Sequence, residues 1–210
     1  MKILAVVLLL LAATACTATE PGTPAREEWL AGKLTFRAVA NQAPTSKPSS
    51  GYPVPQQKSD DPAVQTARAS RQSTDAAIRE QALGSLDCTA PDPLVGNDDP
   101  AAPLVTCDAG EYRYDLGPVF LDGDRVAAAT ASFDQNGGGH VVTVEFDGEG
   151  ARTWSDFTTA NVDKQVAILI NGRVLSAPTI QSPITGGSAQ ISGKFTRDEA
   201  DQLARQLVGR

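Results

Sequence analysis

Residues 165–177 read QVAILINGRVLSA, two apolar runs on either side of the dipeptide Asn171-Gly172. Asn-Gly is the strongest short sequence signal for a two-residue hairpin turn, because both positions tolerate the positive φ that such a turn requires. The flanking runs are then expected to pair as antiparallel strands. This stretch therefore predicts an antiparallel hairpin, and the rest of the fold is built around it.

Strand and helix patterns continue before this hairpin. The runs RVAAATASFD (125–134) and HVVTVEFD (140–147) predict two strands joined by a glycine-rich turn. Asp147 is placed to cap a helix over about 148–161. One face of that helix would carry Ala151, Trp154, Phe157 and Thr158.

The pattern after the hairpin completes the class of the fold. The run SAQIS (188–192) predicts another short strand, and Thr196 with Glu199 forms a capping box that opens a last helix. That helix presents one apolar stripe, made of Ala200, Leu203, Ala204 and Leu207. This order of elements predicts an α+β fold, a small antiparallel β-sheet with helices packed on one face.

The N-terminus has the features of an export signal. Residues 1–15 combine a basic start, an apolar run and small residues before Cys16. The segment is too short for a spanning helix, and it resembles the lipobox of bacterial lipoproteins, in which the cysteine is lipidated. We therefore expect lipidation at Cys16, a tether over 16–32, and a location on the extracytoplasmic face of the cell membrane. The alternative is an ordinary signal peptide that happens to contain a cysteine.

Two further cysteines, Cys88 and Cys107, enclose a short segment rich in proline and aspartate. Export implies an oxidising compartment, where an even pair of cysteines favours a disulfide over two free thiols. No CxxC motif for redox chemistry or metal binding is present.

The chain before residue 112 divides by composition. The alternation in residues 33–39 predicts a strand, and the proline- and serine-rich residues 40–60 predict a disordered linker. Residues 61–111 would hold one or two helices, beginning at Asp61-Pro62, and then the disulfide loop. Residues 112–210 would form the α+β domain.

Catalytic and cofactor motifs are incomplete. The sequence around Ser188 lacks the last glycine of a G-x-S-x-G nucleophile elbow, and Gly193-Lys194 is followed by Phe195, unlike a phosphate-binding loop. The single histidine, His140, falls in a predicted hairpin, so nothing local supports a serine triad. We therefore expect no enzyme, no catalytic residue and no cofactor.

Metal and nucleic-acid binding have equally little support. Asp134 and Glu145 match parts of a calcium loop, but two ligand positions hold Gly138 and Val142 and the flanks predict strands. Asp122 and Asp124 more often form a turn and a helix cap than a metal site. The formal net charge of −7 and the lack of a basic stripe in the sequence argue against nucleic-acid binding.

Residues 114–207 resemble a known family over most of their length. The segments that carry the likeness are Leu116-Gly117-Pro118, AILINGRVLSAPTIQ (167–181), ITGGSAQISG (184–193) and FTRDEADQLARQL (195–207). They resemble the head subdomain in the first extracytoplasmic domain of SecD, the protein-export membrane component of SecDF. LTFRAV (34–39) resembles a strand of SecD, and the segment between the two cysteines resembles that of actinobacterial SecD proteins.

The resemblance implies a module that handles polypeptide and carries no catalytic residue. Expected partners are unfolded secretory polypeptide or components of the Sec translocon. SecD proteins have several transmembrane helices, whereas no spanning segment follows the signal peptide here, so we expect a stand-alone lipoprotein accessory to export and not a proton-driven motor. The alternative is a surface lipoprotein that uses the fold as a structural or small-ligand module unrelated to Sec.

Overall fold

The computed structural model describes residues 32–45, 58–135 and 137–208. The strands form two sheets, and within each sheet the neighbouring strands pair antiparallel. The five-stranded sheet has the order β2 (Leu104–Cys107), β3 (Tyr112–Asp122), β1 (Leu34–Pro44), β6 (Val166–Ile170) and β7 (Arg173–Ser176). The three-stranded sheet has the order β4 (Val126–Asp134), β5 (Gly139–Phe146) and β8 (Ser188–Phe195).

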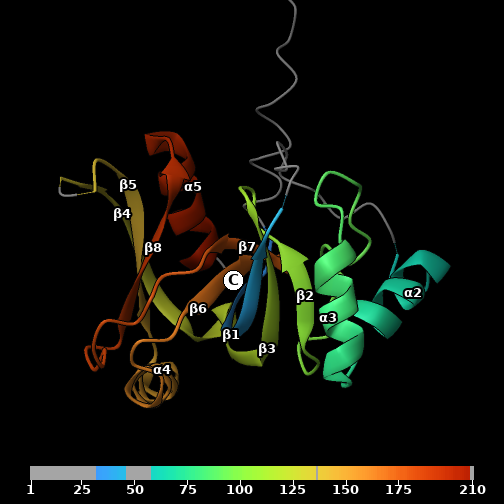
Figure 1. The fold of residues 1–210 in the computed structure, drawn as a ribbon. Coiled ribbons are helices and arrows are strands. Elements are labelled where there is room, and N and C mark those ends of the chain that lie inside the picture. The colour runs from blue at the N-terminus through green and yellow to red at the C-terminus, as the bar shows by residue number, and fades with distance from the viewer. Residues whose placement is uncertain (1–31, 46–57, 136, 209–210) are drawn as a thin grey trace, which may run out of the picture.

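The helices lie between and beside these sheets. They are α2 (Pro62–Arg71), α3 (Ala76–Ser85), α4 (Gly148–Ala160) and α5 (Arg197–Val208), with a short 3-10 turn, η1, at Gly123–Arg125. In Figure 1, α5 lies between the two sheets, α4 lies below it, and α2 and α3 cover the opposite side of the five-stranded sheet. The predicted α+β class is confirmed, but the strands divide between two sheets instead of forming one.

Several local predictions are confirmed. Asn171 and Gly172 have φ angles of 51° and 77°, as the predicted turn requires. Asp147 caps α4, accepting hydrogen bonds from the backbone N–H groups of Glu149 and Gly150. Thr196 and Glu199 exchange the two hydrogen bonds of the capping box, and the four stripe residues of α5 are buried.

Strand β1 is longer than the sequence predicts. The composition of residues 40–60 predicts a disordered linker, but residues 40–44 continue β1, and residues 41–44 pair with β3. Of the rest of this linker, residues 46–57 lie outside the described residues, and Thr45 and residues 58–60 are described but belong to no strand or helix. Because β1 pairs with both β3 and β6, it lies in the middle of the larger sheet and belongs to the same folded unit as the strands after residue 112.

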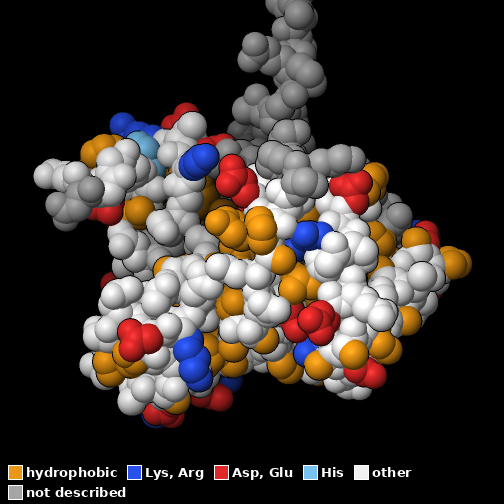
Figure 2. Space-filling view, in the orientation of Figure 1, with side chains coloured by type: hydrophobic (Ala, Val, Ile, Leu, Met, Phe, Trp, Pro, Cys, Tyr) orange, Lys and Arg blue, Asp and Glu red, His pale blue; other side chains and the backbone are white. Residues whose placement is uncertain are grey.

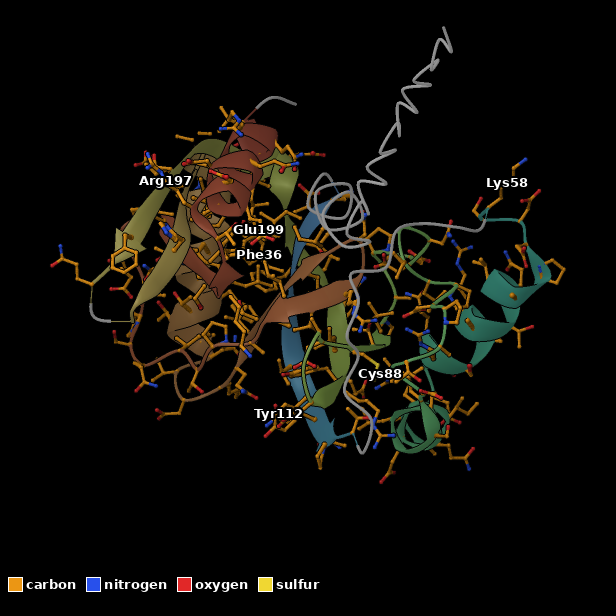
Figure 3. All side chains as sticks on the ribbon, turned by 90° about the horizontal axis from the view of Figure 1, so that it is seen from above. Phe36, Lys58, Cys88, Tyr112, Arg197 and Glu199 are labelled. Atoms are coloured by element: carbon orange, nitrogen blue, oxygen red, sulfur yellow. A yellow bond between two sulfur atoms is a disulfide. The ribbon has the colours of Figure 1, made fainter. Side chains whose placement is uncertain are left out.

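Two hydrophobic cores lie on opposite faces of the five-stranded sheet. The first fills the space between the two sheets and includes Phe36, Val144, Trp154, Ile168 and Leu203. The second packs the other face of the larger sheet against α2 and the segment after α3. Figure 3 shows Phe36 near the centre of the molecule and Cys88 on the side that carries α2 and α3.

A disulfide joins Cys88 to Cys107, with a Cα–Cα distance of 5.8 Å. The segment that it closes is also held by buried side chains of the sheet and of α2. Arg37, with no exposed surface, donates to the carbonyl oxygen of Ala102 and to Asp98. Gln72 exchanges two hydrogen bonds with the backbone of Asp99. The segment is therefore part of the folded core, although it contains no regular structure between residues 88 and 103.

Candidate functional site

The structure separates the residues that a serine triad would need. Ser188 pairs with Glu145 at one end of the β5–β8 ladder, whereas His140 pairs with Phe195 at the other end. Four residues of β5 lie between these pairs, so His140 and Glu145 are about 16 Å apart along the strand. The ring of His140 instead packs edge-on against Phe133 at 5.2 Å. This arrangement does not provide a nucleophile with a base in reach.

The carboxylates that the sequence offered as metal ligands lie in a helix cap and in the strands of the smaller sheet. Asp122 caps η1 and accepts a hydrogen bond from the backbone N–H of Asp124. Asp134 ends β4 opposite Gly139, and Glu145 pairs with both Ala128 and Ser188 inside the smaller sheet. In the part of the chain that the structure describes, no group of three His, Cys, Asp or Glu side chains could hold a metal ion. Cys16 lies outside the described residues.

A groove of about 400 Å³ opens between β6, the start of β8 and the segment that connects β7 to β8. The described residues that line it carry apolar side chains, hydroxyls and amides, and none of them is charged: Trp154, Val166, Ile168, Pro178, Thr179, Ile180, Gln181, Ser182, Ile184, Ser188, Ala189 and Gln190. We call it the β6–β8 groove. Its size and apolar lining are typical of ligand sites.

One wall of this groove is the segment 177–187, which is irregular yet held by hydrogen bonds. The backbone N–H of Ile180 donates to the carbonyl of Lys164 at 2.9 Å, and Val166 donates to Pro178 at 3.0 Å. Further along, the N–H of Ile184 donates to the hydroxyl Oγ1 of Thr158 on α4 at 3.0 Å. These bonds keep the wall in place although Pro178 cannot extend the strand before it.

The opposite side of the groove is formed in part by Trp154 of α4. The Asp147 cap orients this helix, and the hydrogen bond from the Gly150 N–H is the main cause that lowers the pKa of Asp147. Trp154 is 2% exposed, and its ring contacts those of Phe36 and Phe146 at centroid distances of 5.5 and 5.7 Å. These aromatic contacts fix the indole in one position.

The indole N–H of Trp154 is a buried donor without an acceptor in the described part of the chain. Its Nε1 makes no hydrogen bond to any described residue. Buried Trp N–H groups usually have a partner. The helical pattern correctly placed Trp154 on the inner face, but it could not show that the groove is beside it, because the other wall comes from residues 178–190.

The β6–β8 groove lies next to an unpaired strand edge. Strand β8 pairs with β5 alone, and so does β4 at the other side of the smaller sheet; no further strand pairing of either is present in the described ranges. An edge without a strand partner can accept an added strand. Inward side chains of β8, among them Ala189 and Ile191, are buried, so only its edge and outer face are available.

Apolar surface is also visible outside the groove. Figure 2 shows apolar side chains gathered in the middle of the face, between the smaller sheet and the helices α2 and α3. A second cavity of about 450 Å³ lies between α3 and residues 85–93, but the ion pair of Arg71 and Asp92 contributes to its lining. No helix among the described residues is long and apolar enough to cross a membrane. Of these features, the β6–β8 groove best combines an uncharged lining, a free edge and an unsatisfied donor.

Comparison with known proteins gives one consistent result. The family model described as SecDF, P1 head subdomain, matches residues 104–209. The protein translocase subunit SecD of Mycobacterium tuberculosis strain ATCC 25618 / H37Rv is 43% identical over 143 residues, which are 65% of this chain and 25% of that protein. The SecD subunit of Dictyoglomus turgidum is 45% identical over 94 residues, 45% of this chain and 23% of the relative.

A solved structure is similar over most of the chain. The crystal structure of SecDF in the super-membrane-facing form has a TM-score of 0.50 and 28% sequence identity. The matched region covers 85% of this chain and 19% of that one. The chain thus spans about a quarter or less of these SecD and SecDF proteins.

Proposed function

Because the chain belongs to the family of the SecDF P1 head subdomain, we propose that it binds extended segments of exported polypeptide and is an accessory to protein export. The relatives are protein translocase subunits, and a module of this family would meet its polypeptide on the extracytoplasmic side of the membrane. The family assignment gives no support to the alternative of a structural or small-ligand module unrelated to Sec.

The observation that carries this proposal is the β6–β8 groove beside the free edge of β8. An extended polypeptide can pair its backbone with such an edge and place alternate side chains in an adjoining pocket. The groove has no charged lining residue, which suits apolar segments that are exposed only while a polypeptide is unfolded. The separation of Ser188 from His140 supports a binding role without catalysis.

The test is titration of the full chain with an unfolded secretory polypeptide, followed by calorimetry. We expect saturable binding, and we expect the same chain to co-purify with components of the Sec translocon. The folded form of the same secretory protein is the control and should not bind. No binding at high micromolar concentration, together with no co-purification, would contradict the proposal.

A hydrolase panel tests the non-enzymatic part of this proposal. Activity that the Ser188→Ala variant abolishes would overturn it, since Ser188 is the serine that the sequence places nearest to a nucleophile motif. We expect no activity in either protein.

Anchoring through lipidated Cys16 is a separate part of the proposal. Two acyl chains on this residue would hold the protein stably at the outer face of the membrane. The Cys16→Ser variant should therefore appear in the soluble fraction of fractionated cells, with Cys88 and Cys107 unchanged as internal controls. If the variant stays with the membrane, the anchor is a different one.

A further inference from the structure

The unsatisfied indole N–H of Trp154 indicates how the β6–β8 groove holds its ligand. Trp154 lines the groove, is 2% exposed, and its Nε1 has no acceptor among the described residues. A buried donor without a partner costs free energy. Because this donor lies beside a binding groove, a ligand that supplies the acceptor would remove that cost and bind more tightly.

Among the described residues, none accepts a hydrogen bond from this indole, and three side chains close to it show why. The rings of Phe36 and Phe146 contact the indole and hold it in place, and neither has an acceptor atom. The hydroxyl of Thr158, one turn further along α4, already accepts from the Ile184 N–H and donates to the Ser155 carbonyl. The indole N–H therefore makes no hydrogen bond within the described structure.

The uncharged lining of the groove indicates which kind of acceptor atom the ligand supplies. None of the described lining residues is charged, so a carboxylate or phosphate would lose its hydration without gaining a counter-charge from them. A neutral carbonyl has no such penalty. The main chain of an extended polypeptide offers a carbonyl at every residue, with side chains that alternate in direction.

We propose that Trp154 Nε1 donates a hydrogen bond to a main-chain carbonyl of the bound polypeptide, next to an apolar, uncharged side chain that enters the β6–β8 groove. This inference rests on the proposed function and specifies the ligand of the same site. Nε1 is covered in the free chain, so the carbonyl reaches it only when side chains of the groove move apart.

The experiment uses the full chain and a capped peptide of about ten residues in which valine and serine alternate. Calorimetry compares the wild type with the Trp154→Phe variant, which keeps an aromatic ring and removes the N–H. We expect the variant to bind about three- to tenfold more weakly, the effect of one lost hydrogen bond. A peptide with aspartate in place of the valines should bind neither protein.

A second measurement uses the wild-type chain, so it does not depend on any substitution in the groove. In the ¹⁵N-labelled wild type, the indole N–H signal of Trp154 should move downfield when the peptide binds, and its exchange with solvent should become slower. The chain has two tryptophans, so the Trp29→Phe variant assigns the signal and is the matched control for calorimetry.

The outcomes distinguish this inference from the proposed function. If the peptide binds, but Trp154→Phe binds it equally well and the indole signal does not move, the role of Trp154 is wrong and the polypeptide-binding function stands. If neither the peptide nor unfolded secretory polypeptide binds the wild type, the proposed function and the inference are both wrong.

Discussion

Arg71 of α2 and Asp92 of the disulfide-closed segment form a buried, bidentate ion pair, with N–O distances of 2.6 and 2.9 Å. The same guanidinium donates through Nε to the carbonyl of Val105 in β2. Three parts of the chain that are distant in sequence therefore meet at one side chain. This contact explains how a segment without regular structure is held against the larger sheet.

Removing one partner of this pair should be strongly destabilising. Arg71→Met leaves the buried Asp92 carboxylate without its hydrogen-bonded partner, with only the charge of Arg173 nearby, and the loss of one partner costs about 3–5 kcal/mol in comparable buried pairs. Urea denaturation at neutral pH measures the loss in the free energy of unfolding. The control is Arg125→Met, which breaks a pair whose two side chains are 41% and 39% exposed and should change stability little. Equal effects of the two substitutions would contradict this account.

The pKa of Asp92 predicts a dependence of stability on pH. Burial alone would raise this pKa, but Arg71 and the backbone N–H of Leu94 hold it below its ordinary value of 3.8. Because the folded-state pKa is the lower one, the stabilisation is present above about pH 4 and is lost as the pH falls through the folded-state pKa. Denaturation at a series of pH values should show this loss.

The Arg71→Met variant provides the control for that pH series. Without the guanidinium, burial raises the pKa of Asp92 above its unfolded-state value. Part of the stability lost at neutral pH should then return as the pH falls and the carboxylate becomes protonated. A parallel pH dependence in both proteins would show that Asp92 is not the responsible group.

Loss of the disulfide should weaken the fold without abolishing it. Closure of a loop between Cys88 and Cys107 contributes about 3 kcal/mol on the chain-entropy model. Arg37 and Arg71 still hold the segment when the covalent bond is absent. The double variant Cys88→Ser and Cys107→Ser should therefore unfold cooperatively at a lower urea concentration. An unfolded double variant would mean that the ion pairs cannot hold the segment alone.

The elements that the sequence predicted are those determined by neighbouring residues. The Asn171-Gly172 turn, the Asp147 cap and the capping box at Thr196 depend on contacts within a few positions of the chain. Local patterns are sufficient in such cases. The inner face of α4 and the stripe of α5 were likewise visible in their helical periodicity.

Strand β3 shows why other elements were missed. Gly117 and Pro118 argue against a strand in the sequence, yet β3 continues through them. The register between β1 and β3 shifts at this point, so these two residues have no partner in the ladder. The Gly117 carbonyl instead accepts a hydrogen bond from Arg37, which is 80 residues away in sequence. A local sequence pattern cannot show that a distant arginine replaces the missing ladder hydrogen bond of Gly117.

The groove depends on long-range contacts as well. Its walls come from α4, β6, β8 and the segment between β7 and β8, and they meet only because the strands divide into two sheets. The sequence predicts neither a nucleophile elbow nor a phosphate-binding loop around Ser188 and Gly193-Lys194, and the structure adds that the segment between β7 and β8 forms a wall of the candidate site.

A polar substitution in that wall should weaken polypeptide binding without unfolding the chain. Ile184 is half-buried in the groove wall, and its backbone N–H bonds to Thr158 whichever side chain it carries. Ile184→Asn removes apolar surface that would contact the ligand, so we expect affinity to fall about tenfold. The matched control is Ile78→Asn on α3, which changes an isoleucine that is 41% exposed and does not line the groove. Calorimetry with unfolded secretory polypeptide compares the two variants, and a larger loss for Ile78→Asn would place the binding surface beside α3 instead of in the β6–β8 groove.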